Sequence, residues 1–387
     1  MKKHLFPLFL LLLGANTYAQ RDFFAITGKN TQSIDFNNLR EIEGTSGTTG
    51  RVIFSADITS KVFSQKRNRI VVEDKQSYSS SQAPAMAALA YDFSDNRLVY
   101  MPMFSSNIYV LNLETKEITL IENNVATVSS CDINSHITRM TAGYDGNIYA
   151  VNNSGTQFLQ IQKKNGQYLV HDLGMIKDEA SNGKNSFTAL ETGFGGDMVA
   201  GADHNFYIFA ASGNVFKISI QDMTARFIGK IAGIPEHYSV NGSAVNDKGN
   251  VVIASAKGAP LYEVNLETLQ AVQLPGEKDL HIYDLASKYF VNNKSAPVNF
   301  STIDIYPTRV DEQFINIRIN NKNIKGNIRM NVFDLSGKQV MNENLFIKEE
   351  TINQKIYFNN LAEGAYLVNI TDDSGKAILN KKILITK

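Results

Sequence analysis

The stretch AGYDGNIYAV at residues 142–151 places three turn-forming residues, Asp-Gly-Asn, between two apolar runs. The same pattern returns as FSDNRLVYMP from Phe93 and as NDKGNVVIAS from Asn246. Asp, Asn and Gly accept the left-handed backbone of tight strand connections, and the flanking Val, Ile, Tyr and Phe favour strands. The pattern therefore predicts a β-hairpin that recurs along the chain.

Each predicted hairpin is the first half of a longer unit. It is followed by a segment with a period of two, as in Phe216-x-Ile218-x-Ile220, then by a polar turn and a fourth strand. Four strands per unit, with aligned turn aspartates 50, 58 and 44 residues apart, are typical of a β-propeller. These aspartates lack the dense alternating ligands of calcium loops, so turn formation explains them. They are Asp95, Asp145, Asp203 and Asp247.

The two ends of this region predict how the ring closes. DFFAITGKNTQSIDFNNLREIEG, from Asp22, supplies strands two to four of a unit, with Ile34 and Phe36 at alternating positions, but no first strand. HIYDLASKYFV, from His281, has the pattern of a first strand with nothing after it. We expect the two segments to pair as one blade, because that closure removes an exposed sheet edge.

The number of blades is less firmly indicated by the sequence. Between Phe36 and Leu113 lie 77 residues, too many for one unit and barely enough for two. The segment GRVIFSADITSKVFSQKRNRIVVED, residues 50–74, is either a short sixth blade or a hairpin inserted into a five-bladed ring. The spacing slightly favours six blades.

The two termini and the composition indicate an exported protein. MKKHLFPLFLLLLGANTYAQ has a basic start, a short apolar run and small residues before Gln20, which predicts a signal peptide at residues 1–19. That run is too short for a membrane anchor, and we expect no transmembrane segment after its removal. Lys plus Arg and Asp plus Glu both total 38, so no nucleic-acid partner is expected. The one cysteine, Cys131, forms no internal disulfide, so the core must hold the fold.

A second domain follows the repeats. The predicted propeller covers residues 20–294, and a polar linker covers residues 295–300. Alternating strands such as Ile328 to Phe333 and Tyr366 to Ile370 then predict a small all-β sandwich at residues 298–387.

Four phrases in this sandwich carry a family resemblance: IDIYPTRVDEQFINIRI, NVFDLSGKQVMNENL, INQKIYFNNLAEGAYLVNI and KKILITK. Together they resemble the type A C-terminal sorting domain of the type IX secretion system of Bacteroidota. The family usually begins Tyr-Pro-Asn-Pro, whereas Thr308 and Arg309 follow the Tyr-Pro here. The residues that match the motifs are Tyr306, Pro307, Asp334, Leu335, Ser336, Gly337, Leu361, Gly364, Tyr366, Lys381 and Lys382.

The resemblance implies a destination. The outer-membrane machinery of type IX secretion would read the tail, which is commonly removed when cargo is released or attached to surface lipopolysaccharide. We therefore expect export through the periplasm to the outer cell surface or the medium. The final strand, AILNKKILITK, alternates apolar residues with lysine, and either adds to a partner by its edge or carries protecting charges.

The candidate ligand site is the mouth of the propeller channel, where the loops before the innermost strands gather. Three of the histidines fall there, and imidazole is both a metal ligand and a proton shuttle. No His-x-His or His-Glu-x-x-His motif and no carboxylate cluster accompanies them, so we expect no metal and no cofactor. Cys131 and Asp132 lie in one of these loops. The candidate ligand-binding residues are His136, Arg139, His237, Asn241 and His281.

These features predict a surface-delivered propeller that acts as a binding or interaction module for a surface protein or glycan. The alternative is an extracellular hydrolase, lactonase or lyase that acts on a small molecule or glycan. Carboxylates and histidines that converge in the channel would favour the enzyme, and an aromatic-rimmed face would favour the binding module.

Overall fold

The computed structural model describes residues 23–28, 36–44, 46–55, 60–73, 85–164, 166–291, 302–306, 308–310, 313–320, 324, 326–347, 351–358 and 361–386. The predicted signal peptide, the predicted linker, Ile34 and Pro307 lie outside these residues. Almost every element is a strand, and α1 (Leu190–Gly193) is a single turn of helix.

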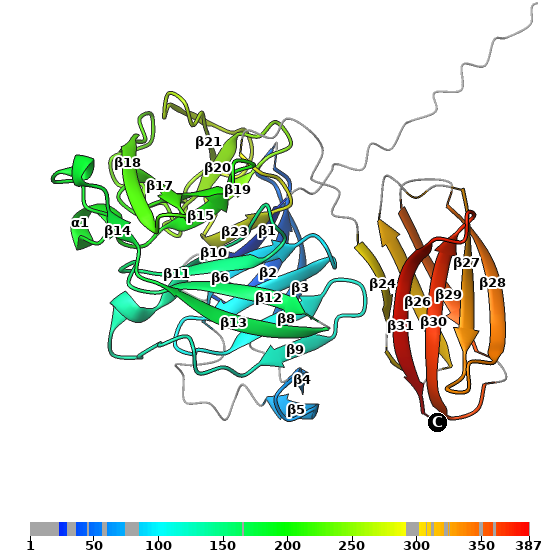
Figure 1. The fold of residues 1–387 in the computed structure, drawn as a ribbon. Helices are drawn as coiled ribbons and strands as arrows, with labels where there is room; N and C mark the ends of the chain where they lie inside the picture. Colours follow the sequence, from blue (N-terminus) through cyan, green and yellow to red (C-terminus); the bar gives the residue numbers. More distant parts are fainter. Residues whose placement is uncertain are drawn as a thin grey trace, which may run out of the picture.

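Five sheets form the first domain (Figure 1). Blade 1 contains β23 (Ile282–Ser287), β1 (Phe23–Thr27), β2 (Asn38–Ile42) and β3 (Thr49–Ser55). Blade 2 contains β6 (Met86–Asp92), β7 (Arg97–Pro102), β8 (Ile108–Asn112) and β9 (Ile118–Ile121). Blade 3 contains β10 (Ile137–Ala142), β11 (Ile148–Asn152), β12 (Phe158–Lys164) and β13 (Gln167–Gly174).

The remaining two blades follow the same order. Blade 4 contains β15 (Asp197–Ala200), β16 (Asn205–Phe209), β17 (Asn214–Ser219) and β18 (Thr224–Lys230), and the short β14 (Lys177–Asp178) pairs with β18. Blade 5 contains β19 (Gly242–Val245), β20 (Val251–Ala254), β21 (Tyr262–Val264) and β22 (Ala271–Gln273).

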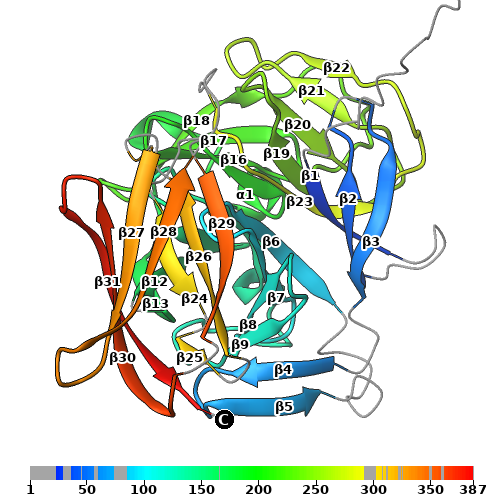
Figure 2. The same ribbon diagram turned by 90° about the vertical axis from the view of Figure 1, so that its right-hand side faces the viewer.

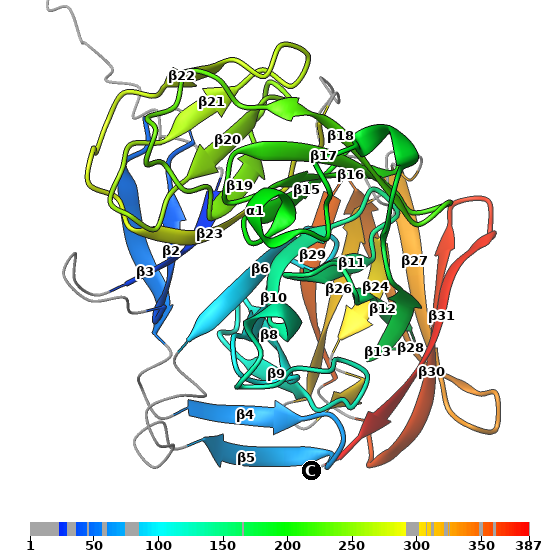
Figure 3. The same ribbon diagram turned by 90° about the vertical axis from the view of Figure 1, so that its left-hand side faces the viewer.

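The five sheets form a closed ring. The innermost strands β6, β10, β15, β19 and β23 each contact the next, and β23 contacts β6 (Figure 3). The last strand, β23, pairs antiparallel with β1, so that Phe23 lies opposite Ser287. The predicted pairing of the first and last segments is therefore confirmed. The strand positions predicted for the first segment are corrected: β2 begins at Asn38, after Phe36, and the fourth strand, β3, lies beyond that segment, mostly within the residues assigned to the extra blade or hairpin.

The sixth blade favoured by the residue spacing is wrong. Residues 60–73 form a hairpin of β4 (Ser60–Ser64) and β5 (Arg69–Glu73). Strand β4 pairs in parallel with β9, so the hairpin extends blade 2 at its outer edge (Figure 2). The extra residues thus widen one sheet instead of adding a blade to the ring.

The core lies between the blades. Alternate residues of a strand face opposite neighbours: Ile148 and Ala150 pack against blade 2, whereas Tyr149 and Val151 pack against blade 4. In the described part of the chain, one such apolar cluster fills each of the five boundaries between blades. Because every blade is buried on both faces, no blade is stable without its two neighbours.

The predicted turns have the expected chemistry. Asp145 Oδ1 accepts the Asn147 N–H at 3.1 Å, and Gly146 has a φ of 83°. In blade 4, Asp203 plays the same part for Asn205, and His204 takes the left-handed conformation with a φ of 60°. Turn formation therefore accounts for Asp145 and Asp203. For Asp95 and Asp247 the prediction is corrected, because the turn acceptors in blades 2 and 5 are Asp92 and Asn246, and Asp95 pairs with Lys163 instead.

The C-terminal domain is a two-sheet sandwich. One sheet contains β24 (Thr302–Tyr306), β26 (Phe314–Asn320) and β29 (Thr351–Tyr357). The other contains β25 (Arg309–Val310), β31 (Ala377–Ile385), β30 (Gly364–Asp372), β27 (Gly326–Phe333) and β28 (Gln339–Ile347). Alternate residues of these strands, mostly Ile and Val, form the core between the sheets.

Deletion of residues 60–73 tests the five-bladed ring. We expect the protein to keep its β-sheet circular dichroism and one cooperative thermal transition, because the contacts among the innermost strands remain. The loss of buried Val62 and of the 2.7 Å bond from Tyr109 Oη to Glu73 Oε1 lowers stability by about 2–4 kcal/mol. An unfolded deletion variant would show instead that the hairpin is needed for closure.

Candidate functional site

A pocket of about 390 Å³ lies at one end of the propeller axis. Every blade contributes to it at or near the start of its innermost strand, so the pocket exists only when the ring is closed. The residues that line this mouth pocket are Phe36, Ala87, Met103, Ile133, His136, Thr138, Asn153, Phe194, Gly195, Gly196, Ala211, Ser239, Asn241, Ala256, Lys257 and Tyr283.

The walls of the mouth pocket are largely apolar and aromatic. The rings of Phe36 and Tyr283 lie 4.2 Å apart at an interplanar angle of 57°. Gly196 has a φ of 81°, and a Cβ there would lie 1.9 Å from the carbonyl oxygen of Phe209. Only glycine therefore fits at this position, which keeps side chains out of this part of the pocket.

Most of the lining polar groups are engaged within the protein. Asn153 Oδ1 accepts the Thr138 hydroxyl at 2.5 Å, and its Nδ2 donates to the carbonyl of Ile133 at 2.9 Å. Asn241 Oδ1 accepts the Ala256 N–H at 3.0 Å. Of the four residue types Asp, Glu, Lys and Arg, the described lining of the pocket contains one residue, Lys257.

His136 lines the mouth pocket, but its nitrogens do not open onto it. The side chain is 3% exposed, and its Nε2 donates to the carbonyl of Ser129 at 2.9 Å. Its Nδ1 is buried and has no hydrogen-bond partner within the described residues. Phe104 packs edge-to-face against the ring at 5.1 Å. His136 is therefore a wall of the pocket and is not placed to transfer protons to a ligand there.

Arg139 does not line the pocket. It is fully buried, and its guanidinium donates to the carbonyls of Gly195 at 3.0 Å, Asn153 at 3.4 Å, Asn152 at 3.5 Å and Gly193. Burial lowers the pKa of Arg139 to about 9. Removing a guanidinium from water costs several kcal/mol, which these charge-assisted bonds offset while joining blade 3 to the loop before β15.

Of the other predicted ligand residues, Asn241 lines the mouth pocket with His136, whereas His237 and His281 do not. His237 is exposed, and its carbonyl oxygen lies 3.4 Å from Lys257 Nζ. His281 bonds to the carbonyl of Ala256 through Nδ1 at 2.9 Å, and its Nε2 lies 3.2 Å from Asp279 Oδ1. The structure therefore does not gather the histidines into one cluster.

The loop before β10 holds the two remaining residues singled out in the sequence. Cys131 is exposed, with its sulfur 3.9 Å from Ser130 Oγ. Asp132 caps a short turn of helix by accepting the Asn134 N–H at 3.0 Å. Neither residue lines the mouth pocket.

Sequence reasoning missed two buried carboxyl groups. Asp197 begins β15 directly after the glycines that line the pocket, and Asp284 follows Tyr283 in β23. Both side chains are 0% exposed. The sequence signal was a single charged residue at a position where the strand is otherwise apolar, as in HIYDLAS.

Burial raises the pKa of both carboxyl groups, and Asp197 raises that of Asp284 further. Asp197 is partly compensated, since it accepts the N–H groups of Met198 at 2.6 Å and Ser243 at 2.5 Å. The oxygens of Asp284 have no geometrically good hydrogen bond within the described residues. Burial and the lack of well-formed hydrogen bonds therefore both shift Asp284 toward the neutral carboxylic acid.

No metal centre is evident at the mouth. Among the described residues, no group of three or more His, Cys, Asp or Glu side chains is arranged to hold an ion. Nor does the described part of the chain contain a helix with the length and apolar character needed to cross a bilayer.

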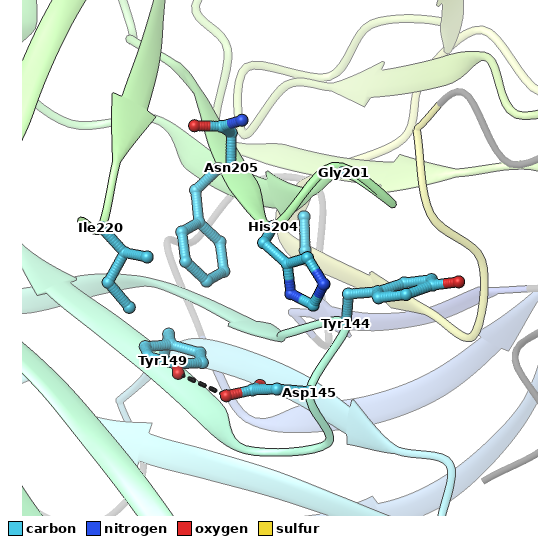
Figure 4. A pocket seen from close by; sticks show the side chains of 9 residues that line it. Tyr144, Asp145, Tyr149, Gly201, His204, Asn205 and Ile220 are labelled. Carbon is cyan, nitrogen blue, oxygen red and sulfur yellow. Dashed lines mark hydrogen bonds between the residues drawn. The ribbon is translucent and has the colours of Figure 1, made fainter.

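A second hollow of about 50 Å³ lies between blades 3 and 4, at the opposite ends of the innermost strands (Figure 4). His204 packs edge-to-face against Tyr144 at 5.1 Å. Tyr149 Oη donates to Asp145 Oδ2 at 2.7 Å. The space suffices for about one or two water molecules, so the mouth pocket is the better candidate site.

The comparison with known families concerns the C-terminal sandwich. Residues 304–386 match the family model described as the secretion system C-terminal sorting domain. This sandwich is a type IX secretion sorting domain. The protein is therefore exported to the cell surface or secreted.

The whole chain has no match among curated proteins. Its fold is similar to the extracellular domain of a hybrid two-component system from B. thetaiotaomicron, at 10% identity and a TM-score of 0.35. That match covers 95% of this chain and 56% of the other, so the chain spans little more than half of that structure's length.

Two further structures are similar in fold alone. A protein of unknown function from Bacteroides caccae matches at 10% identity and a TM-score of 0.41, over 68% of this chain and 97% of the other. Virginiamycin B lyase from Staphylococcus aureus matches at 9% identity and a TM-score of 0.33, over 94% of this chain and 96% of the other. At these values the likeness indicates nothing about ligand or activity.

The motif residues of the sorting domain lie mainly in its turns and core. Asp334 Oδ1 accepts the Ser336 and Lys338 N–H groups at 2.9 and 3.0 Å in the turn that contains Leu335 and Gly337. Tyr366 is buried, and its Oη donates to the carbonyl of Ala362 at 2.9 Å. Leu361 packs against the core, and Gly364 begins β30. Tyr306 ends β24.

The final strand is paired differently along its two edges. On one side β31 pairs with β30 along its length, and on the other side its pairing with β25, within the described residues, involves Leu384 and Ile385. Lys381 and Lys382 lie before the segment that pairs with β25. Both suggestions from the sequence, edge addition to a partner and protection by charge, remain compatible with this edge.

Replacing Asp284 with asparagine tests the buried acid. A carboxyl group with a raised pKa stabilises the fold when protonated, and that stability is lost as the pH rises through the raised pKa. Asp284→Asn should therefore exceed the wild type in stability by about 1–3 kcal/mol at pH 8, and the difference should shrink toward pH 5. Urea denaturation of both proteins between pH 5 and 8.5 measures it.

Asp178→Asn is a control for which the opposite change in stability is expected. Burial raises the pKa of Asp178, but bonds from the Phe187 N–H, Ser186 and Asn182 outweigh it and hold the pKa below its usual value. Asp178→Asn should therefore be less stable than the wild type at neutral pH, with a difference that shrinks in acid. A difference between Asp284→Asn and the wild type that does not change with pH would contradict the neutral Asp284.

Proposed function

We propose that this exported propeller is a binding module that takes part of a surface protein or glycan into the mouth pocket. The observation that carries the proposal is the lining itself, which joins aromatic walls to a few polar groups and, within the described part of the chain, includes no Asp or Glu. A cavity of about 390 Å³ holds one sugar ring, one side chain or one chain end. Such a site suits recognition of a terminus of a larger partner.

The enzymatic alternative has less support at this pocket. A hydrolase or lyase needs a base or nucleophile within hydrogen-bond reach of the substrate. The Nδ1 of His136 is buried and its Nε2 is bonded to the carbonyl of Ser129, and Asp197 and Asp284 are completely buried. Among the described residues, a substrate in the pocket would therefore meet no side chain placed as a general base.

A pocket-filling substitution tests the site. Ala256→Trp places an indole in the mouth pocket, so binding of a glycan or peptide found by array screening should fall more than tenfold by calorimetry. Lys248 lies at the turn between β19 and β20, at the far end of blade 5. The control variant Lys248→Gln should therefore bind the ligand as the wild type does. Turnover of a lactone or polysaccharide that is lost in Ala256→Trp would support the enzyme instead.

Removal of the sorting domain tests the proposed secretion route. Without residues 298–387 we expect a folded propeller that accumulates in the periplasm, because its five interblade clusters contain no residue of the sandwich. Cell fractionation and limited proteolysis measure location and folding. Normal secretion of the shortened chain would contradict the role of the tail.

A further inference from the structure

The mouth pocket has a charge preference as well as a shape. We propose that it selects a ligand that carries a carboxylate next to an apolar ring or chain, with Lys257 as the partner of the carboxylate. This inference rests on the proposed binding function and names the chemical class that the pocket accepts.

Lys257 is held at the rim but has no ion-pair partner in the described structure. It lies in the loop after β20, where its N–H donates to Ser255 Oγ at 3.2 Å. Its Nζ makes only a long contact of 3.4 Å with the carbonyl of His237. The nearby carboxylate of Asp279 pairs with His281 rather than with Lys257. An ammonium group has three donors, so Lys257 can bind an acceptor from a ligand.

The layer beneath the pocket does not cancel this charge. Arg139, Asp197 and Asp284 follow directly in sequence the lining residues Thr138, Gly196 and Tyr283. The guanidinium of Arg139 balances one ionised carboxyl group, and complete burial opposes ionisation of the second. The three groups together therefore leave the attraction of an anionic ligand to Lys257 in place.

The rest of the lining fits the uncharged part of such a ligand. Phe36, Phe194 and Tyr283 contribute aromatic side chains to the lining, and Ala87 and Ala211 add small apolar ones. Because Asn241 Oδ1 is occupied by the Ala256 N–H, this side chain contributes its Nδ2 as a donor. Two donors, Lys257 Nζ and Asn241 Nδ2, at an aromatic pocket match a carboxylate joined to a ring.

Three matched probes test this preference on the mature full-length protein: 3-phenylpropionate, 3-phenylpropan-1-ol and 3-phenylpropylamine. They share one ring and one chain length and differ only in the head group. By calorimetry at pH 7 and low salt, the acid should bind at least five- to tenfold more tightly than the alcohol, and the amine should bind most weakly. High salt should reduce the advantage of the acid, since the lysine is near solvent.

Variants separate the role of Lys257 from general charge. Lys257→Gln should weaken binding of 3-phenylpropionate about five- to tenfold and leave the affinity for 3-phenylpropan-1-ol unchanged. The matched control Lys248→Gln removes an exposed lysine at the far end of the same blade and should change neither. Ala256→Trp should abolish binding of both probes, which assigns them to the mouth pocket.

The other possible outcomes of the probe and variant experiments each overturn a specific part of the inference. Equal affinity for acid and alcohol in the wild type would overturn the carboxylate preference and leave the binding pocket standing. An acid preference that survives Lys257→Gln would overturn the assignment to Lys257. Binding that persists in Ala256→Trp would place the probes elsewhere and overturn the inference. No binding of any probe would overturn the inference and count against the proposed function as well.

Discussion

The pairing of β23 with β1 is the constraint on which the first domain depends. Each blade is apolar on both faces, so a linear row of five blades would leave two apolar faces and one unsatisfied strand edge in water. The antiparallel pairing of residues 282–287 with residues 23–27 buries the exposed apolar faces and satisfies the strand edge at the same time. It also forms the cluster between blades 5 and 1, in which Phe23, Ile42 and Leu285 pack against Val252 and Leu261.

Ring closure also determines what the axis can hold. Five innermost strands meet there, and polar side chains at the centre lose their water. The fold tolerates Arg139 because four main-chain carbonyls surround its guanidinium, and it tolerates Asp197 because main-chain N–H groups bond its carboxylate. The N–H groups of Leu89 and Leu285 lie near Asp284 but form no well-directed hydrogen bond with it, so protonation lowers the free-energy cost of its burial.

The repeat, the closure and the sorting domain could be predicted from the sequence because each rests on local patterns: turn residues, a period of two and motif spacing. The hairpin of residues 60–73 could not be placed, since its alternation is the same whether it begins a blade or joins the edge of one. The parallel pairing of Val62 with Ile118 decides the matter, and no local pattern encodes it. Similarly, the sequence placed His136 and Asn241 at the mouth, but could not show that Arg139 is buried against the glycine loop before β15.

The strand that closes the ring also builds the ligand site. Tyr283 forms a wall of the mouth pocket, the next residue Asp284 is fully buried, and Leu285 packs in the cluster between blades 5 and 1. A ligand that contacts Tyr283 therefore binds only when β23 is paired with β1. By linkage, such a ligand must stabilise the closed ring, by about 2.7 kcal/mol when its concentration is one hundred times its dissociation constant. Recognition at the mouth and closure of the propeller are thus two aspects of one equilibrium.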